Sequence, residues 1–127
     1  MRVVLGVGGR PGGDADELAA LVRTCLVGLD LAVGDVSVVA TLDRRAAEPG
    51  VRDVAGRLGA RVVAVDPHTL AAQDVPHPSE LVRRHTAASG VAEAAVLAVG
   101  ARLLASKRRS AAWTVAVGRL ETTEEDR

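Results

Sequence analysis

The chain has 127 residues, of which 48% are hydrophobic and 25% charged, with 16 Lys or Arg against 16 Asp or Glu. This length suits one globular domain, and the composition excludes an intrinsically disordered chain. The balanced charge lacks the basic excess typical of nucleic-acid-binding proteins. Phe and Tyr are absent and Trp113 is the only aromatic residue, which argues against a stacking platform for single-stranded nucleic acid.

Cysteine content and hydropathy indicate the expected cellular compartment. Cys25 is the single cysteine, so no intrachain disulfide can form, and its place in an apolar helical pattern predicts a small core residue. No apolar run reaches the roughly 18 residues that a membrane-spanning helix needs. The sequence starts directly with a strand pattern and not with a signal peptide. We therefore expect a cytoplasmic protein without a membrane partner.

The first elements are predicted by hydrophobic spacing and by a helix-capping pattern. An apolar run predicts a strand over 2–7, and a glycine-rich turn over 8–13 follows it. Asp14, with Glu17 three residues later, predicts the N-terminal cap of a helix. The apolar positions of that helix recur at helical spacing: Leu18, Leu21, Val22, Cys25, Leu26 and Leu29.

The later elements are predicted from β-branched runs, proline and glycine. They are a strand over 36–40, a helix opened by Glu48-Pro49-Gly50 and ended by Gly59, a strand over 61–65, a short helix around Leu70 capped by Asp66, a rigid loop over 75–78, a helix capped by Ser79, a helix over 91–99, and strands over 103–105 and 114–117.

Strands that alternate with helices at this spacing imply right-handed βαβ units. We predict an α/β fold with three α/β/α layers and a mostly parallel sheet of about five strands. The two C-terminal strands should form an antiparallel hairpin that adds one antiparallel strand at an edge. A single domain over 1–120 and an acidic tail over 121–127 complete the expected organisation.

Ligands of such sheets collect at the carboxyl ends of the strands, and the glycine-rich turn is one such loop. Gly8, Gly9 and Gly12 let a ligand approach backbone amides at a helix N-terminus, where an anion is favoured. Arg10 adds a forked donor suited to carboxylate or phosphate. Pro11 breaks the dinucleotide fingerprint, and no Lys-Ser/Thr pair follows as in a phosphate loop. The pattern fits an anion site, and it also fits a tight turn that only closes a βα unit.

Five segments then occur in a fixed order along the chain. They are Gly6-Val7-Gly8-Gly9-Arg10-Pro11-Gly12, Asp43-Arg44-Arg45-Ala46-Ala47-Glu48, His77-Pro78-Ser79-Glu80-Leu81-Val82, Gly90-Val91-Ala92-Glu93-Ala94-Ala95, and Lys107 followed by Thr114-Val115-Ala116-Val117-Gly118-Arg119. In this order and spacing they resemble the CobE/CbiG C-terminal family of cobalamin biosynthesis from Val3 to Arg119. Gly9 stands where that family has a cysteine, and Arg45 replaces a lysine.

The resemblance implies a function in corrin-ring assembly. In CbiG-like proteins the domain is joined to an N-terminal part, and the whole opens a lactone of cobalt-precorrin-5A and releases acetaldehyde. In CobE-like proteins it stands alone, and this chain resembles that form. We therefore expect a protein that binds a carboxylate-rich precorrin or cobalt-precorrin intermediate and assists or catalyses lactone opening, with a hydrolase-like activity that needs a partner domain as one option.

The same resemblance frames the expected cofactors and partners. No cofactor is expected, and cobalt would enter only as part of the substrate. The expected partners are the corrinoid intermediate and other corrin-pathway enzymes, with no nucleic acid and no membrane, and an oligomer is left open. The alternative function is a small phosphate- or nucleotide-binding regulatory module that uses the same glycine turn.

The carboxylate rim of a corrin precursor needs several hydrogen-bond donors. The expected ligand-binding residues are Gly8, Gly9, Arg10, Gly12, Arg45, Ser79, Glu80 and Lys107. Lactone hydrolysis also needs a general base, for which Glu48 and Asp43 are the candidate catalytic residues, with His77 and Glu93 as further bases. A structural alternative exists, because Asp43 and Glu48 could pair with Arg45 or cap the second helix. The three histidines lack zinc-type spacing, so no metal site is expected.

Overall fold

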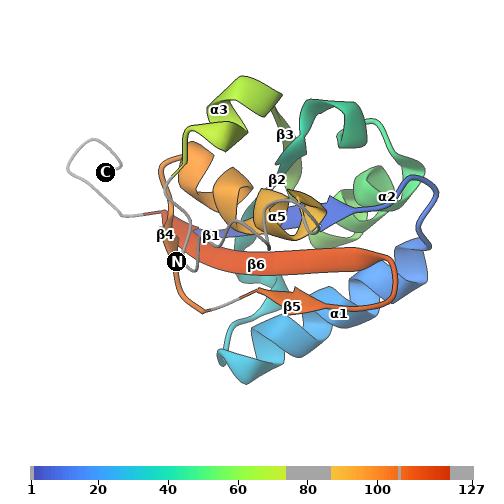
Figure 1. Cartoon of the computed structure of the whole chain (residues 1–127). Helices are drawn as coiled ribbons and strands as arrows, with labels where there is room; N and C mark the ends of the chain where they lie inside the picture. The colour runs from blue at the N-terminus through green and yellow to red at the C-terminus, as the bar shows by residue number, and fades with distance from the viewer. Residues whose placement is uncertain (1, 74–86, 106, 121–127) are drawn as a thin grey trace.

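The computed structural model describes residues 2–73, 87–105 and 107–120, apart from the side chains of 87–89. The predicted loop over 75–78, Ser79, Glu80 and the tail over 121–127 lie outside the described residues. In chain order the elements are β1 (Arg2–Gly9), α1 (Ala15–Gly28), η1 (Val33–Asp35), β2 (Val36–Leu42), η2 (Asp43–Arg45), α2 (Pro49–Leu58), β3 (Arg61–Val65), α3 (Pro67–Ala71), α5 (Ala87–Ala98), β4 (Arg102–Leu103), β5 (Arg108–Arg109) and β6 (Trp113–Leu120) (Figure 1).

The local start and stop signals act as predicted. The Asp14 carboxylate accepts the Glu17 amide at 3.0 Å at the start of α1, and Asp66 accepts the Thr69 amide at 2.8 Å at the start of α3. Gly59 ends α2 with a φ of 70°, in the left-handed region that favours glycine. These three caps confirm the corresponding helix boundaries.

The sheet is mixed, with strand order β3-β2-β1-β6-β4, and β5 also pairs with β6. Strands β1, β2 and β3 are parallel, whereas β6 runs antiparallel to β1, β4 and β5. The prediction of a mostly parallel sheet is therefore wrong, whereas the predicted antiparallel pairing of the C-terminal strands is confirmed. The prediction that the antiparallel strand lies at an edge of the sheet is also wrong. Strand β6 pairs with β1 along its whole length, from Trp113 to Leu120, and lies inside the sheet.

The burial of β6 explains this position. Its first six residues are buried on both faces of the sheet, as in strands covered by a helix layer on each side. The segments that form β4 and β5 carry basic side chains and are too short for an interior strand. They line up one after the other along β6 as an interrupted outer strand, a usual way to protect a sheet edge.

Helices cover both faces of the sheet, which confirms the predicted three layers (Figure 1). Because successive strand residues point to opposite faces, Val3 and Leu5 of β1 pack with α1 and α2, and Val4 packs with α3 and α5. The core is built almost wholly from Val, Leu and Ala.

Helix α5 lies unusually close to the sheet. An added Cβ at Gly6 would stand 1.9 Å from the carbonyl oxygen of Ala92, and one at Gly118 would stand 2.3 Å from a methyl carbon of Val96. Only glycine therefore fits at these two positions of the adjacent strands β1 and β6. The alanines of α5 complete this contact from the helix side.

This contact predicts the effect of a single methyl group. We expect Gly6→Ala to lower the free energy of unfolding by at least about 1–3 kcal/mol, because the helix must shift away from the sheet. Gly56→Ala is the matched control, since a Cβ there meets nothing within 4 Å. This change should raise the free energy of unfolding by about 0.5–1 kcal/mol. Urea unfolding measures both variants. Equal stability of Gly6→Ala and the parent chain would contradict the close contact.

Candidate functional site

The candidate site lies at the edge of the sheet where β1, β2 and β3 end. Because these strands are parallel, their carboxyl ends meet at one edge, and the glycine turn, η2 and Asp66 follow there. Strand β6 begins at the same edge, where Trp113 pairs with Gly9. We call this edge the rim.

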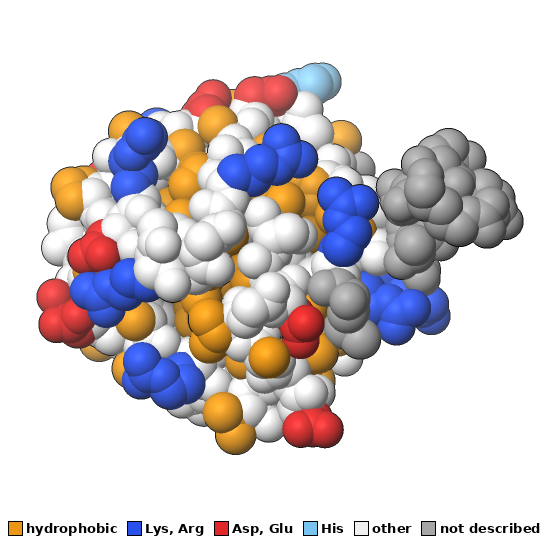
Figure 2. Space-filling view, turned by 180° about the vertical axis from the view of Figure 1, so that it is seen from behind, with side chains coloured by type: hydrophobic (Ala, Val, Ile, Leu, Met, Phe, Trp, Pro, Cys, Tyr) orange, Lys and Arg blue, Asp and Glu red, His pale blue; other side chains and the backbone are white. Residues whose placement is uncertain are grey.

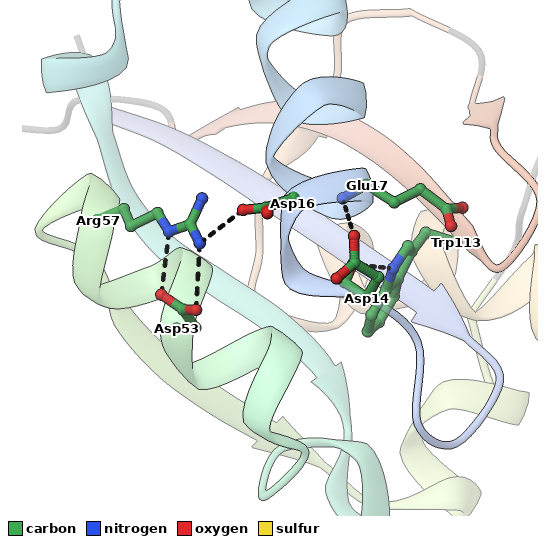
Figure 3. A network of polar contacts seen from close by, with 6 residues as sticks. All are labelled: Asp14, Asp16, Glu17, Asp53, Arg57 and Trp113. Atoms are coloured by element: carbon green, nitrogen blue, oxygen red, sulfur yellow. Dashed lines mark hydrogen bonds and ion pairs between the residues drawn. The ribbon is translucent and has the colours of Figure 1, made fainter.

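Trp113 is the buried centre of the rim, with 1% of its surface exposed. A Cβ added at Gly9, Gly13 or Gly50 would stand 2.6, 2.7 or 2.9 Å from atoms of its ring. Its indole N–H donates to the carbonyl oxygen of Asp14 at 2.9 Å (Figure 3). The ring thus joins the glycine turn to the first turns of α1 and α2, and it leaves no room for a side chain at Gly9, where the resembling family has a cysteine.

The glycine turn is held from the η2–α2 connection. The Gly12 amide donates to Oε1 of Glu48 at 2.9 Å, and Nε of Arg45 donates to the Gly9 carbonyl oxygen at 3.2 Å. The Arg10 amide donates to the carbonyl oxygen of Ala112 at 3.1 Å. The structural alternative for Glu48 was a helix cap, but its side chain makes no capping bond to α2 and binds the glycine turn instead.

The structure therefore brings most of the predicted site residues together. They are Gly8, Gly9, Arg10, Gly12, Arg45 and Glu48, with the exposed Asp43 at the start of η2. Lys107 lies apart from them, before β5, where its Nζ is 3.4 Å from Oε1 of Glu93. Ser79, Glu80 and His77 fall outside the described residues.

Sequence reasoning missed the role of Glu17 in this rim. Its carboxylate accepts hydrogen bonds from the Ser110 hydroxyl and, at 2.8 Å, from the Ala112 amide. These bonds, with the Ser110 hydroxyl first, lower the pKa of Glu17 below its ordinary value of 4.5. The contact fixes the turn that leads into Trp113. No local pattern could have revealed it, because the partners lie 93 and 95 positions away.

A second polar contact ties α1 to α2 near the rim (Figure 3). Arg57 donates from Nε to Asp53 at 3.0 Å within α2, and from Nη2 to Asp16 of α1 at 2.9 Å. The three side chains are largely exposed, so each pair contributes at most about 1 kcal/mol. They join the last turn of α2 to the first turn of α1.

A small cavity of about 50 Å³ lies away from the rim, between α1 and the outer strand. Cys25, Gly28 and Arg108 are among its lining residues. Burial raises the pKa of the Cys25 thiol, which disfavours the reactive thiolate form. This cavity is too small for a macrocyclic ligand, and Cys25 is a core residue, as predicted.

Three further observations on the described residues concern surface charge, metal ligands and membrane-spanning helices. On the face drawn in Figure 2, basic side chains are spread among apolar and acidic ones and form no continuous stripe. Among the described residues, no three His, Cys, Asp or Glu side chains gather as a metal site would require. Within the same residues, no helix combines the length and the apolar character needed to cross a bilayer.

The sequence matches one family model and two known relatives. The family model described as cobalamin synthesis G C-terminus matches residues 3–118. The protein CobE of a Sinorhizobium species is 39% identical over 101 residues, which are 78% of this chain and 65% of that protein. A cobalt-precorrin-5A hydrolase of Priestia megaterium is 30% identical over 117 residues, which are 91% of this chain and 31% of that protein. The chain thus spans less than two thirds of either relative.

Solved structures agree with the sequence matches. The crystal structure of CobE, a protein from the cobalamin (vitamin B12) biosynthetic pathway, has a TM-score of 0.81 and 31% identity, with 96% of this chain and 92% of that chain covered. A putative cobalamin biosynthesis protein G homolog from Sulfolobus solfataricus has a TM-score of 0.75 and 21% identity, with 95% and 37% covered. The second likeness shows a common fold.

The packing of the Trp113 ring predicts that even a conservative replacement of this residue lowers stability. Trp113→Phe removes the N–H donor to Asp14 and part of the ring volume between the three glycines. We expect the free energy of unfolding to fall by about 1–3 kcal/mol, from the cavity and the unpaired carbonyl group. Chemical denaturation followed by far-ultraviolet circular dichroism measures it. A variant as stable as the parent would contradict the proposed anchoring.

The lowered pKa of Glu17 predicts an acid-dependent contribution to stability. A carboxyl group whose pKa is lower in the folded chain stabilises the fold above its unfolded pKa and loses that effect as pH falls through the folded value. Glu17→Gln should therefore be less stable than the parent at pH 7, and the difference should shrink as pH falls below about 4.5. Thermal unfolding across this pH range measures it, with Asp30→Asn as control. A difference independent of pH would contradict the assignment.

Proposed function

The chain belongs to the cobalamin synthesis G C-terminus family, the CobE/CbiG C-terminal family, and on this premise we propose that it binds a carboxylate-rich precorrin or cobalt-precorrin intermediate at the rim. The observation that carries the proposal is the gathering of Arg10 and Arg45 at the glycine turn. Guanidinium groups are well matched to the carboxylates that surround a corrin precursor.

The two arginines differ in the way they are held. Arg45 is half-buried and anchored through Nε to Gly9, so its other N–H donors keep a fixed direction. Arg10 is exposed and follows the buried end of β1, where it can adapt to a second carboxylate. One fixed and one adaptable guanidinium suit a rigid macrocycle with several peripheral acids.

The phosphate- or nucleotide-binding alternative is less well supported by the same contacts. A phosphate cradle needs unoccupied backbone amides in the turn. Here the Gly12 amide already donates to Glu48 and is not available to a phosphate oxygen. The guanidinium groups, and not the turn amides, are then the main anion-binding groups.

Lactone opening is the second part of the proposal. It requires a general base beside the ester carbonyl group and a donor for the developing oxyanion. Asp43 and Glu48 supply carboxylates at the rim, and Arg45 supplies the donor. The matched part is only 31% of the related hydrolase, and we propose that this activity depends on a partner domain.

Titration of the chain with cobalt-precorrin-5A, followed by visible absorption, tests binding. Arg10→Ala and Arg45→Ala should each raise the Kd about 10-fold or more, the usual effect of losing a charge-assisted hydrogen bond. Arg23→Ala is the matched control, because Arg23 lies on α1 roughly 13 Å beyond the Asp14 cap and so away from the rim. No spectral change at micromolar protein, or a double variant that binds as tightly as the control, would refute the proposal. Acetaldehyde assayed in the same mixtures reports ring opening.

A further inference from the structure

Helix α5 carries a buried carboxylate that is only half satisfied. The Glu93 side chain is 1% exposed and its Oε1 lies 3.4 Å from Nζ of Lys107, whose side chain is 20% exposed. Oε2 of Glu93 has no hydrogen-bond partner, and it is the only such buried side-chain atom among the described residues. A buried carboxylate oxygen without a donor is costly, so a role in folding alone does not account for it.

The identity of the partner strengthens this point. Lys107 is the only lysine in the sequence, and every other Lys or Arg position is arginine. An arginine could reach both carboxylate oxygens through its planar fork, whereas an ammonium group binds as a compact point charge. The lysine therefore leaves Oε2 of Glu93 open in a chain that otherwise uses arginine.

The pair faces the layer of α5 beside the rim. Arg108 lines the cavity on the α1 side, and Lys107, one position earlier, meets Glu93 of α5 on the opposite side. Arg108 pairs with Val115, and Val115 pairs with Val7 of β1. The backbone at β5 thus lies two strand spacings, roughly 10 Å, from β1, the strand that leads into the glycine turn. Ala92, the neighbour of Glu93, contacts Gly6 of β1 directly.

We propose that Glu93 and Lys107 form a second contact point for the tetrapyrrole. Oε2 of Glu93 accepts a hydrogen bond from a donor group of the ligand or from a water bound with it, and Lys107 donates to a neighbouring ligand oxygen. This inference rests on the proposed function and adds, outside the rim, a site that pairs a buried carboxylate acceptor with an ammonium donor. A ligand that spans both contact points is held in one orientation.

The single lysine makes a direct experiment available. Reductive methylation of the chain modifies the ε-amine of Lys107 and the terminal α-amine, and mass spectrometry follows each separately. Saturating cobalt-precorrin-5A should slow methylation of Lys107 several-fold and leave that of the α-amine unchanged. The α-amine is therefore an internal control in every sample.

Two variants separate recognition from folding. Lys107→Arg keeps the charge and can pair with both oxygens of Glu93, so it should retain the Tm of the parent and raise the Kd for cobalt-precorrin-5A about 10-fold. Glu93→Gln changes the acceptor with little change of volume and should also raise the Kd about 10-fold. Asp53→Asn, a carboxylate of the α1–α2 contact, is the control for the second variant.

The outcomes distinguish this inference from the function on which it rests. If the parent chain gives no spectral change, both fail. If it binds through Arg10 and Arg45 but Lys107 is not protected, or both variants bind as the parent does, the second contact point is refuted and binding at the rim stands. If Lys107→Arg does not fold, protection of Lys107 in the parent and the affinity of Glu93→Gln decide.

Discussion

The packing of one indole ring against three glycines organises the functional end of this protein. Gly9, Gly13 and Gly50 come from the glycine turn and the first turn of α2, and each lies too close to Trp113 to carry a side chain. The ring also leaves no room for a side chain at Gly9. Since Trp113 begins β6, the same contact anchors the strand that pairs with β1 and brings the Ser110 turn to the rim.

Charged side chains at the rim form hydrogen bonds within the protein. Glu48 and Arg45 hold the glycine turn at Gly12 and Gly9, and Glu17 holds the turn before β6. A turn fixed in this way presents side-chain guanidinium groups in defined positions, whereas a phosphate loop presents unoccupied amides. This difference explains how a glycine-rich βα turn can lack both nucleotide fingerprints and still be suited to a carboxylate ligand.

The α5 layer, on the other face of the sheet, depends on a different packing contact. Gly6 and Gly118 let α5 approach the sheet so closely that its alanines pack against the backbone. In this tight layer a carboxylate such as Glu93 is buried although its only described partner is a single ammonium group. Under the proposed function, the rim and the α5 layer therefore contribute chemically distinct contact points to one ligand.

The sequence alone determined the features that depend on residues a few positions apart. These are the caps at Asp14 and Asp66, the end of α2 at Gly59, the alternation of strands and helices, and the gathering of the loops after β1 and β2 at one edge. Tertiary structure decided the rest. The inner position of β6, the bond from Gly12 to Glu48 and the attachment of Glu17 to Ser110 join residues far apart in sequence, and no local pattern records which distant donor meets which acceptor once the layers pack.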